Sequence, residues 1–277
     1  MLVTLSEILR DANERHYAVG AFNSLSVENV MGAIEAAERL RSPIILQLAE
    51  VQFPEAPLDL MAPLFLQAAR KATVPVCVHL DHGQSLETCV KAIRLGFTSV
   101  MFDGAALPFE ENVAVTREVT RIAKAAGVDV EAELGKVGDS GVDTADVFTD
   151  VDESVRFVQA TGVDALAIAI GNLHGHYVHT PQLNIARLIE IHEANRLPLV
   201  LHGGSGTSTE DFKACIHNGI CKINVATAIQ RGIMKQMNAR LAAKPDEGYI
   251  PLKQVMIDAS RDVVADHIRL FESDGKA

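Results

Sequence analysis

Three histidines in this chain each follow a short apolar run and precede a glycine-containing or polar turn: His82 in VCVHLDHG, His174 in ALAIAIGNLHGHY and His202 in LPLVLHGGSG. Neutral imidazoles are good ligands for Zn²⁺, and three protein ligands leave one coordination position open for substrate. A single histidine after a strand is more often a hydrogen-bonded structural residue than a ligand. Three of them at three strand ends favour a catalytic zinc site.

Carboxylates accompany these histidines. Asp81 directly precedes His82, so it could exchange a proton with a substrate beside the metal, or instead orient the imidazole. Asp103 and Glu133 stand at the ends of two further apolar runs. His79 lies in the same run as Asp81, and we assign it no ligand role, because a structural histidine explains it equally well.

A glycine-rich turn follows His202 in the segment LHGGSGTSTEDF. Its backbone amides, together with the start of the next helix, can bind a phosphate. The alternative is a tight turn that needs glycine for a positive φ. In KINVATAI, Asn224 and Thr227 begin another expected helix, and barrel enzymes often bind phosphate where two such helix starts converge. Metal and phosphate together suggest a phosphorylated carbonyl substrate.

Bringing these residues together requires a fold that gathers strand ends. Short β-branched runs alternate with amphipathic segments along the chain, which predicts one (β/α)₈ TIM barrel over residues 1–277 with a C-terminal helical extension at 251–272. A doubly wound open sheet is the alternative. The Gly- and Asp-rich segment 135–150 is expected to be a lid loop. The predicted strands are residues 18–22, 43–47, 76–80, 99–102, 129–133, 165–170, 199–201 and 221–224.

Composition excludes several functions. The net charge is −11 and the basic residues form no run, which argues against nucleic acid or an anionic membrane surface as partner. The four cysteines show no CxxC spacing, so neither a disulfide framework nor a thiolate zinc site is expected. No apolar stretch approaches the ~20 residues of a membrane span. We expect a cytoplasmic protein.

Eight segments together give the chain a family resemblance: YAVGAFN, HLDHG, SVMFDGA, VEAELG, AIAIGNLHGHY, LPLVLHGGSG, GICKINVAT and SRDVV. They resemble the class II, zinc-dependent ketose-bisphosphate aldolases, most nearly the tagatose-bisphosphate aldolase branch. The resemblance implies that His82, His174 and His202 bind Zn²⁺. It further implies that Asp81 exchanges the proton of the aldehyde-derived oxygen, and that Asp103 and Glu133 provide an alternative metal position.

The same resemblance implies a sugar phosphate as substrate, a monovalent cation near its phosphate, and a homodimer or homotetramer. Arg261 would hold an anion at the distal end of the substrate, either in its own subunit or in a neighbouring one. The other implied substrate-binding residues, which would surround dihydroxyacetone phosphate, are Asn23, Gly175, Gly203, Ser205, Asn224 and Thr227.

Departures from the family pattern narrow the expected activity. The 135–150 loop lacks the usual glutamate and offers only Asp139, Asp143 and Asp146 as a base. Ala49, Glu50 and Val51 replace residues that hold a second phosphate in many relatives, and Ala226 replaces an aspartate of the fructose-bisphosphate branch.

We therefore expect reversible cleavage of a ketose 1-phosphate, or a ketose bisphosphate, into dihydroxyacetone phosphate and an aldehyde, with the aldehyde expected to be unphosphorylated. One alternative is a tagatose-1,6-bisphosphate aldolase that gives glyceraldehyde 3-phosphate. A metal-dependent hydrolase and a non-catalytic sugar-phosphate binding protein are the others.

Overall fold

The computed structural model describes residues 1–135, 138–139, 148–174, 182–203 and 207–277. Within these ranges eight parallel strands form a closed ring. Each barrel strand pairs with the next one along the chain, and the last of them, β11, pairs with the first, β2. The closed ring confirms the barrel and excludes the open sheet. In order around the ring the strands are β2 (Val19–Asn23), β3 (Ile44–Ala49), β4 (Val76–Gly83), β5 (Ser99–Phe102), β6 (Asp129–Leu134), β8 (Ala165–Ile168), β10 (Leu199–Leu201) and β11 (Ile220–Val225).

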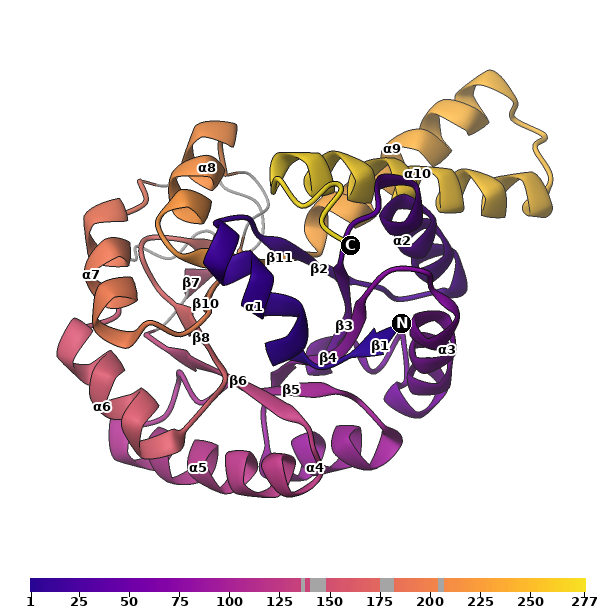
Figure 1. Cartoon of the computed structure of the whole chain (residues 1–277). Helices are drawn as coiled ribbons and strands as arrows, with labels where there is room; N and C mark the ends of the chain where they lie inside the picture. The colour runs from indigo at the N-terminus through magenta and orange to yellow at the C-terminus, as the bar shows by residue number, and fades with distance from the viewer. Residues whose placement is uncertain (136–137, 140–147, 175–181, 204–206) are drawn as a thin grey trace.

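Helices surround this barrel and cover the outward-facing side chains of its strands (Figure 1). Serine or aspartate caps the start of several of them: Ser26, Ser85, Asp150 and Ser208 each accept a backbone N–H of the first helical turn, as expected for these residue types. The helices of the ring are α2 (Val27–Leu40), α3 (Leu58–Lys71), α4 (Leu86–Leu95), α5 (Phe109–Ala125), α6 (Val151–Thr161), α7 (Ile185–Asn195) and α8 (Thr209–His217).

The N-terminal segment closes one end of the barrel. Strand β1 (Leu2–Val3) pairs with the beginning of β4, and α1 (Leu5–Arg15) lies across the barrel mouth in Figure 1. Leu5, Leu9 and neighbouring apolar residues of α1 join a buried cluster with the inward-facing Val19 and Val200. This apolar plug fills the end of the barrel where the strands begin, so a reaction site has to lie at the opposite end.

The C-terminal extension consists of two helices, α9 (Thr227–Ala243) and α10 (Tyr249–Leu270). They pack against each other and project beyond the barrel ring in Figure 1, while α10 also packs along α2. The contact with α2 is close: a Cβ added at Gly32 would lie 2.6 Å from the carbonyl oxygen of Ile257. The helix expected at residues 251–272 is thus present with slightly earlier limits.

Short elements connect the strand ends on the site side. The turn of 3₁₀ helix η1 (Glu50–Gln52) follows β3, and β7 (Gly138–Asp139) pairs with β9 (Leu173–His174). The segment 135–150 was expected to be a lid loop, and the described part of it includes β7. No helix in the described part of the chain is long and apolar enough to cross a membrane.

Candidate active site

Polar side chains fill the barrel toward the carboxyl ends of its strands. This half contains fully buried charged groups, among them Glu131 on β6 and Lys222 on β11, whereas the half near α1 is apolar. Buried charges are costly unless they are paired, so such a concentration marks a functional region. The buried polar residues that line the barrel there are Asn23, Gln47, His79, Asp81, Glu131, Glu133, His202, Lys222 and Asn224.

A local distortion of β4 lets two adjacent residues face the same site. Neighbouring residues of a regular strand point to opposite faces of the sheet, yet Asp81 and His82 approach each other, with 3.8 Å between Oδ1 and Nε2. The pairing of β4 with β5 shifts register between Leu80 and Gly83, and His82 has a left-handed backbone with φ 44°. A positive φ is strained for a residue with a side chain, and such strain is typical of functional sites.

The imidazoles of His82 and His202 converge from strands on different sides of the barrel. Nε2 of His82 lies 2.9 Å from Nδ1 of His202, and the two rings meet edge to face. The opposite nitrogen of each ring contacts a carboxylate: His82 Nδ1 lies 2.8 Å from Asp103 Oδ2, and His202 Nε2 lies 2.9 Å from Glu131 Oε1. Because ionised carboxylates only accept hydrogen bonds, the outer nitrogen of each ring carries the hydrogen, and the two inner nitrogens face the centre of the site, where Glu133 Oε2 lies 3.4 Å from His202 Nδ1.

This donor set fits a metal ion. Imidazole ligands normally donate their second N–H to a carboxylate or carbonyl, which fixes the ring and its tautomer, and both histidines here are held in that way. Among the residues that the structure describes, two groups have their ligand atoms within 4.8 Å of one another: Asp81 with His82 and His202, and His82 with Asp103 and Glu133. The second group contains the alternative metal position that the resemblance implied, although Asp103 contacts the outer nitrogen of His82 in this structure.

The third predicted ligand is only partly described. His174 ends β9, and its side chain lies outside what the structure describes. Gly175 and Ser205 also fall outside the described residues. Their roles, like that of His174 in metal binding, stay predictions.

The Asp81 carboxylate is held between two amides. Nδ2 of Asn23 donates to Oδ2 at 2.8 Å, and Nδ2 of Asn224 donates to Oδ1 at 2.9 Å. Asn23 is itself held, because Nε2 of Gln47 donates to its Oδ1 at 2.8 Å. Both asparagines were predicted to bind substrate, and the structure places them directly beside the predicted proton-transfer group.

The charges of the site favour an ionised Asp81 and a protonated His82 when no metal is bound. Burial alone would raise the pKa of Asp81, but His82, His202 and Lys222 outweigh it and hold that pKa below its ordinary value. Burial alone would lower the pKa of His82, but the surrounding carboxylates, led by Asp81, raise it to about 10. The metal-free site therefore carries a proton on His82 at neutral pH.

Metal binding is consequently expected to release a proton and to strengthen as the pH rises. A metal needs the neutral imidazole of His82, whose pKa in the folded protein is about 10, so the apparent affinity should grow about tenfold per pH unit below that value. Competition with a chromophoric chelator between about pH 6 and 8 measures this slope. An affinity independent of pH would contradict the assignment of His82 as a ligand.

Two glycine-rich or polar turns lie where phosphate was expected. Gly203 follows β10 with a left-handed φ of 72°. This backbone conformation favours glycine, as expected for the tight turn that was the alternative to a phosphate site. Helix α8 begins shortly after it at Thr209, and α9 begins at Thr227 directly after β11. Both helix starts thus follow neighbouring strands of the barrel, and the backbone N–H groups of their first turns lie on the site side, one of them, Asp211 N, bonded to the Ser208 cap.

Arg261 has partners within its own chain. Its guanidinium contacts Asp258 at 2.6 Å and Asp262 at 2.8 Å, and Glu35 of α2 lies 3.8 Å away. These carboxylates compete with any bound anion. The predicted role of Arg261 toward the distal end of the substrate would therefore need this cluster to rearrange, and it stays a prediction.

The sequence alone indicated no role for four residues of the site, Lys222, Gln47, Gln52 and Glu131. Lys222 contacts Glu131 and Asn224, and Gln52 Oε1 accepts from Asn23 at 3.3 Å. A signal was present: Lys222 precedes Asn224 by two positions and Glu131 precedes Glu133 by two. Residues spaced by two in a strand share a face.

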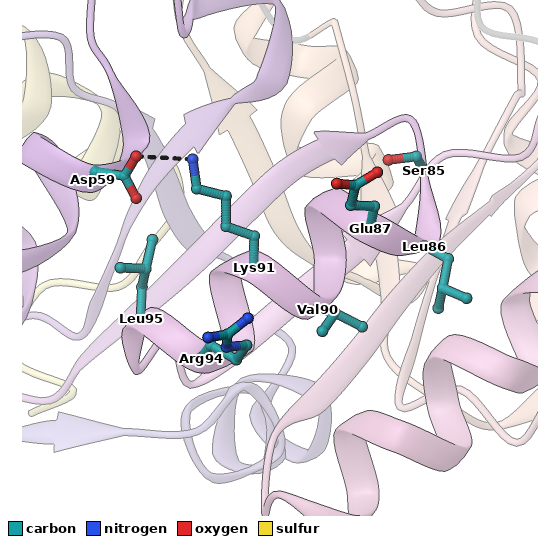
Figure 2. Close-up of a pocket in the computed structure, with 8 residues that line it drawn as sticks. All are labelled: Asp59, Ser85, Leu86, Glu87, Val90, Lys91, Arg94 and Leu95. Atoms are coloured by element: carbon teal, nitrogen blue, oxygen red, sulfur yellow. Dashed lines mark hydrogen bonds and ion pairs between the residues drawn. The ribbon is translucent and has the colours of Figure 1, made fainter.

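A separate groove lies on the helical exterior beside α4 (Figure 2). Two of its lining residues, Lys91 and Asp59, form an ion pair at 2.8 Å. Its described lining consists of outer-ring residues and contains none of the residues discussed above for the barrel site: Asp59, Ser85, Leu86, Glu87, Val90, Lys91, Arg94 and Leu95.

A parallel barrel with a paired-histidine site at its carboxyl ends is typical of metal-dependent barrel enzymes. The family model "Fructose-bisphosphate aldolase class-II" matches residues 3–276. The chain belongs to this family and is therefore an aldolase, a carbon–carbon lyase.

Individual relatives agree with this assignment. A probable fructose-bisphosphate aldolase of Bacillus subtilis is 43% identical over 100% of this chain and 99% of its own length. A sulfofructosephosphate aldolase of Alkalicoccus urumqiensis is 39% identical over 98% of this chain and 96% of its own. The crystal structure of the YdjI aldolase of Escherichia coli K12 superposes with a TM-score of 0.92 at 37% identity, covering 100% of both chains.

Proposed function

We propose that this aldolase is zinc-dependent and reversibly cleaves a ketose 1-phosphate or ketose bisphosphate into dihydroxyacetone phosphate and an aldehyde. The observation that carries the proposal is the convergence of His82 Nε2 and His202 Nδ1, 2.9 Å apart, beside the doubly held carboxylate of Asp81. A cation and a proton-transfer group in this proximity are what retro-aldol cleavage requires.

His82 and His202, with His174 as the proposed third ligand, would hold Zn²⁺, and Asp103 with Glu133 would offer an alternative position. When bound, the ion supplies a Lewis acid that stabilises negative charge developing on the oxygens of the three-carbon product. Glu131 and Asp103 would keep the two imidazoles in the required orientation, as their 2.9 and 2.8 Å contacts indicate.

Asp81 is the proposed proton acceptor in the cleavage direction. Its lowered pKa keeps the carboxylate ionised at neutral pH, so it can take the proton of the substrate C4 hydroxyl as the carbon–carbon bond breaks. Asn23 and Asn224 hold both carboxylate oxygens in place. In the condensation direction Asp81 returns the proton to the oxygen of the incoming aldehyde.

The phosphate of the three-carbon half would bind at the starts of α8 and α9, where Gly203, Thr227 and the proposed Ser205 and Gly175 supply backbone and hydroxyl donors. A monovalent cation beside this phosphate is part of the proposal. We further propose a cytoplasmic homodimer or homotetramer.

The aldehyde half is proposed to be unphosphorylated. Ala49 has no polar side-chain atom to offer a second phosphate. Glu50 follows it, but its carboxylate turns toward α4, accepting from Gln84 N at 2.7 Å and from Thr88 Oγ1 at 2.8 Å. A carboxylate facing the site would repel a second phosphate, but Glu50 is engaged elsewhere, so this repulsion is weakened. This favours the tagatose-1,6-bisphosphate alternative as the second candidate.

An aldehyde panel tests the proposal. The purified protein is loaded with Zn²⁺ and incubated with dihydroxyacetone phosphate and either phosphorylated or unphosphorylated aldehydes, and consumption of the ketone is followed. We expect consumption, fastest with an unphosphorylated aldehyde. Preference for glyceraldehyde 3-phosphate would select the second candidate. No consumption with any aldehyde, despite bound zinc, would favour a sugar-phosphate binding protein.

A further inference from the structure

Lys222 is a buried cation to which the proposed mechanism assigns no step. It lies in the middle of β11 with its side chain fully buried. Its ammonium contacts Glu131 Oε2 at 2.8 Å and donates to Asn224 Oδ1 at 2.7 Å. Because a buried ammonium is costly, its retention at the centre of the polar half of the barrel calls for a function.

The contact with Lys222 determines which atom of the Asn224 amide, Oδ1 or Nδ2, faces the ammonium group. An ammonium group only donates hydrogen bonds, so the Asn224 atom that faces Lys222 must be the carbonyl oxygen. The NH₂ group then faces the other way, where it donates to Asp81 Oδ1 at 2.9 Å. Without Lys222 the Asn224 carbonyl would lose the donor that fixes it, and Asp81 alone would hold the amide, so the position of the NH₂ group beside the carboxylate would be less well defined.

The opposite side of Asp81 is built on the same plan with an uncharged residue. Nε2 of Gln47 donates to Asn23 Oδ1, which leaves Nδ2 of Asn23 to donate to Asp81 Oδ2. Each carboxylate oxygen is thus held by an amide, and each amide is oriented by a donor behind it. The repetition on both sides indicates that the orientation of Asp81 is specified by this shell of residues.

Lys222 also reaches the metal side of the site. Glu131, its carboxylate partner, contacts His202 Nε2 at 2.9 Å, and this contact leaves Nδ1 of His202 directed at His82. The ammonium supplies the counter-charge that lets Glu131 remain a buried hydrogen-bond acceptor. One cation therefore touches the supports of both the proton-transfer group and a proposed metal ligand.

We propose that Lys222 is a positioning residue that orients Asp81 through Asn224 and supports His202 through Glu131. The proposal rests on the proposed aldolase reaction. It predicts that the support of Asp81 can be removed while that of His202 is kept. In the double variant Lys222→Met/Glu131→Gln, an amide oxygen remains for His202 and one charge of each sign is removed. Asn224, however, loses the donor that orients it.

Two reactions distinguish orientation of Asp81 from a general defect. Carbon–carbon cleavage needs Asp81 to accept the C4 hydroxyl proton. Exchange of a carbon-bound hydrogen of dihydroxyacetone phosphate with D₂O, followed by proton NMR, involves no C4 hydroxyl. A variant with a misoriented Asp81 should lose the first reaction and keep the second, whereas a variant with a damaged site or a lost metal should lose both together.

For Lys222→Met/Glu131→Gln we expect zinc content near that of the wild type, cleavage lowered about 10- to 100-fold and exchange within about threefold of the wild type. For Lys222→Met alone we expect zinc affinity to fall about 10- to 100-fold as well, because Glu131 loses its counter-charge. Val19→Ala, which perturbs the apolar half of the barrel against α1, is the control for general destabilisation and should keep both rates.

Equal losses of cleavage and exchange in the zinc-loaded double variant, or a cleavage rate like that of the wild type, would overturn the proposal. If the double variant does not fold, Lys222→Gln/Glu131→Gln replaces it, since its amide is one bond shorter but still a donor. Because its glutamine can still donate to Asn224, this variant should retain more cleavage per bound zinc than Asp81→Ala. A loss of cleavage as complete as in Asp81→Ala, with exchange retained, would count against the proposal. A wild-type protein that shows neither reaction would instead overturn the proposed function itself.

Discussion

Replacing Asp81 by alanine is expected to lower the turnover of carbon–carbon cleavage by a factor of about 10² to 10⁴, the range typical of losing a general acid or base. The carboxylate is the group best placed for this step, because it is kept ionised and held between Asn23 and Asn224. Steady-state cleavage of the preferred ketose phosphate, with zinc measured in the same samples, gives the result.

Zinc content distinguishes a proton-transfer role of Asp81 from a role as a metal ligand, which its place beside His82 and His202 also allows. The proposed ligands are the histidines, so Asp81→Ala should keep its zinc and should still exchange the carbon-bound hydrogen of dihydroxyacetone phosphate. Asp81→Asn is the matched variant, since it preserves the shape of the side chain and removes only the charge. Turnover near that of the wild type in both variants would disprove the proton-transfer role, and loss of zinc would make Asp81 a ligand.

Replacing His82 by alanine is expected to remove the metal and to lower cleavage by at least about a thousandfold, since metal-ion catalysis supplies several kcal/mol of charge stabilisation. His82 contributes one of the two inner nitrogens of the site, and it belongs to both groups of described residues that could hold a metal ion. Metal analysis and activity before and after addition of zinc measure both effects.

His217→Ala is the matched control for this variant. His217 is exposed on the outside of the barrel and pairs with Glu272 at 3.1 Å, so its loss should leave zinc and turnover unchanged. Chelation of the wild-type protein should reproduce the His82→Ala phenotype, and added zinc should reverse it in the wild type only. A His82→Ala protein that binds zinc with ordinary affinity would refute the proposed ligand set.

Much of the barrel could be predicted from residue order. The predicted strand limits at 99–102 and 199–201 agree with the structure, because short apolar runs are a local property of the sequence. The predicted strand at 165–170 ends earlier, at Ile168. Its last two apolar residues are buried without pairing in the ladder, and hydrophobicity alone does not distinguish these situations.

The site was predictable to the extent that chemistry is visible in single residues. His82, His202, Asp81 and Glu133 could be chosen because each follows an apolar run, and strand ends converge in a barrel. The structure brings these residues within hydrogen-bonding or ion-pair distance of one another. Lys222 looked like an ordinary strand residue, because nothing in its sequence neighbourhood shows which carboxylate it will face.

What the sequence by itself determined is therefore the barrel, the family and the types of residue at its carboxyl ends, since periodicity and motif are properties of the chain read in order. Only the tertiary structure decided which nitrogen of each imidazole faces inward, that Glu50 turns toward α4, and that Lys222 supports Asn224 and Glu131. These depend on atoms from different strands meeting at about 3 Å, and on the left-handed backbone of His82, which no local pattern encodes.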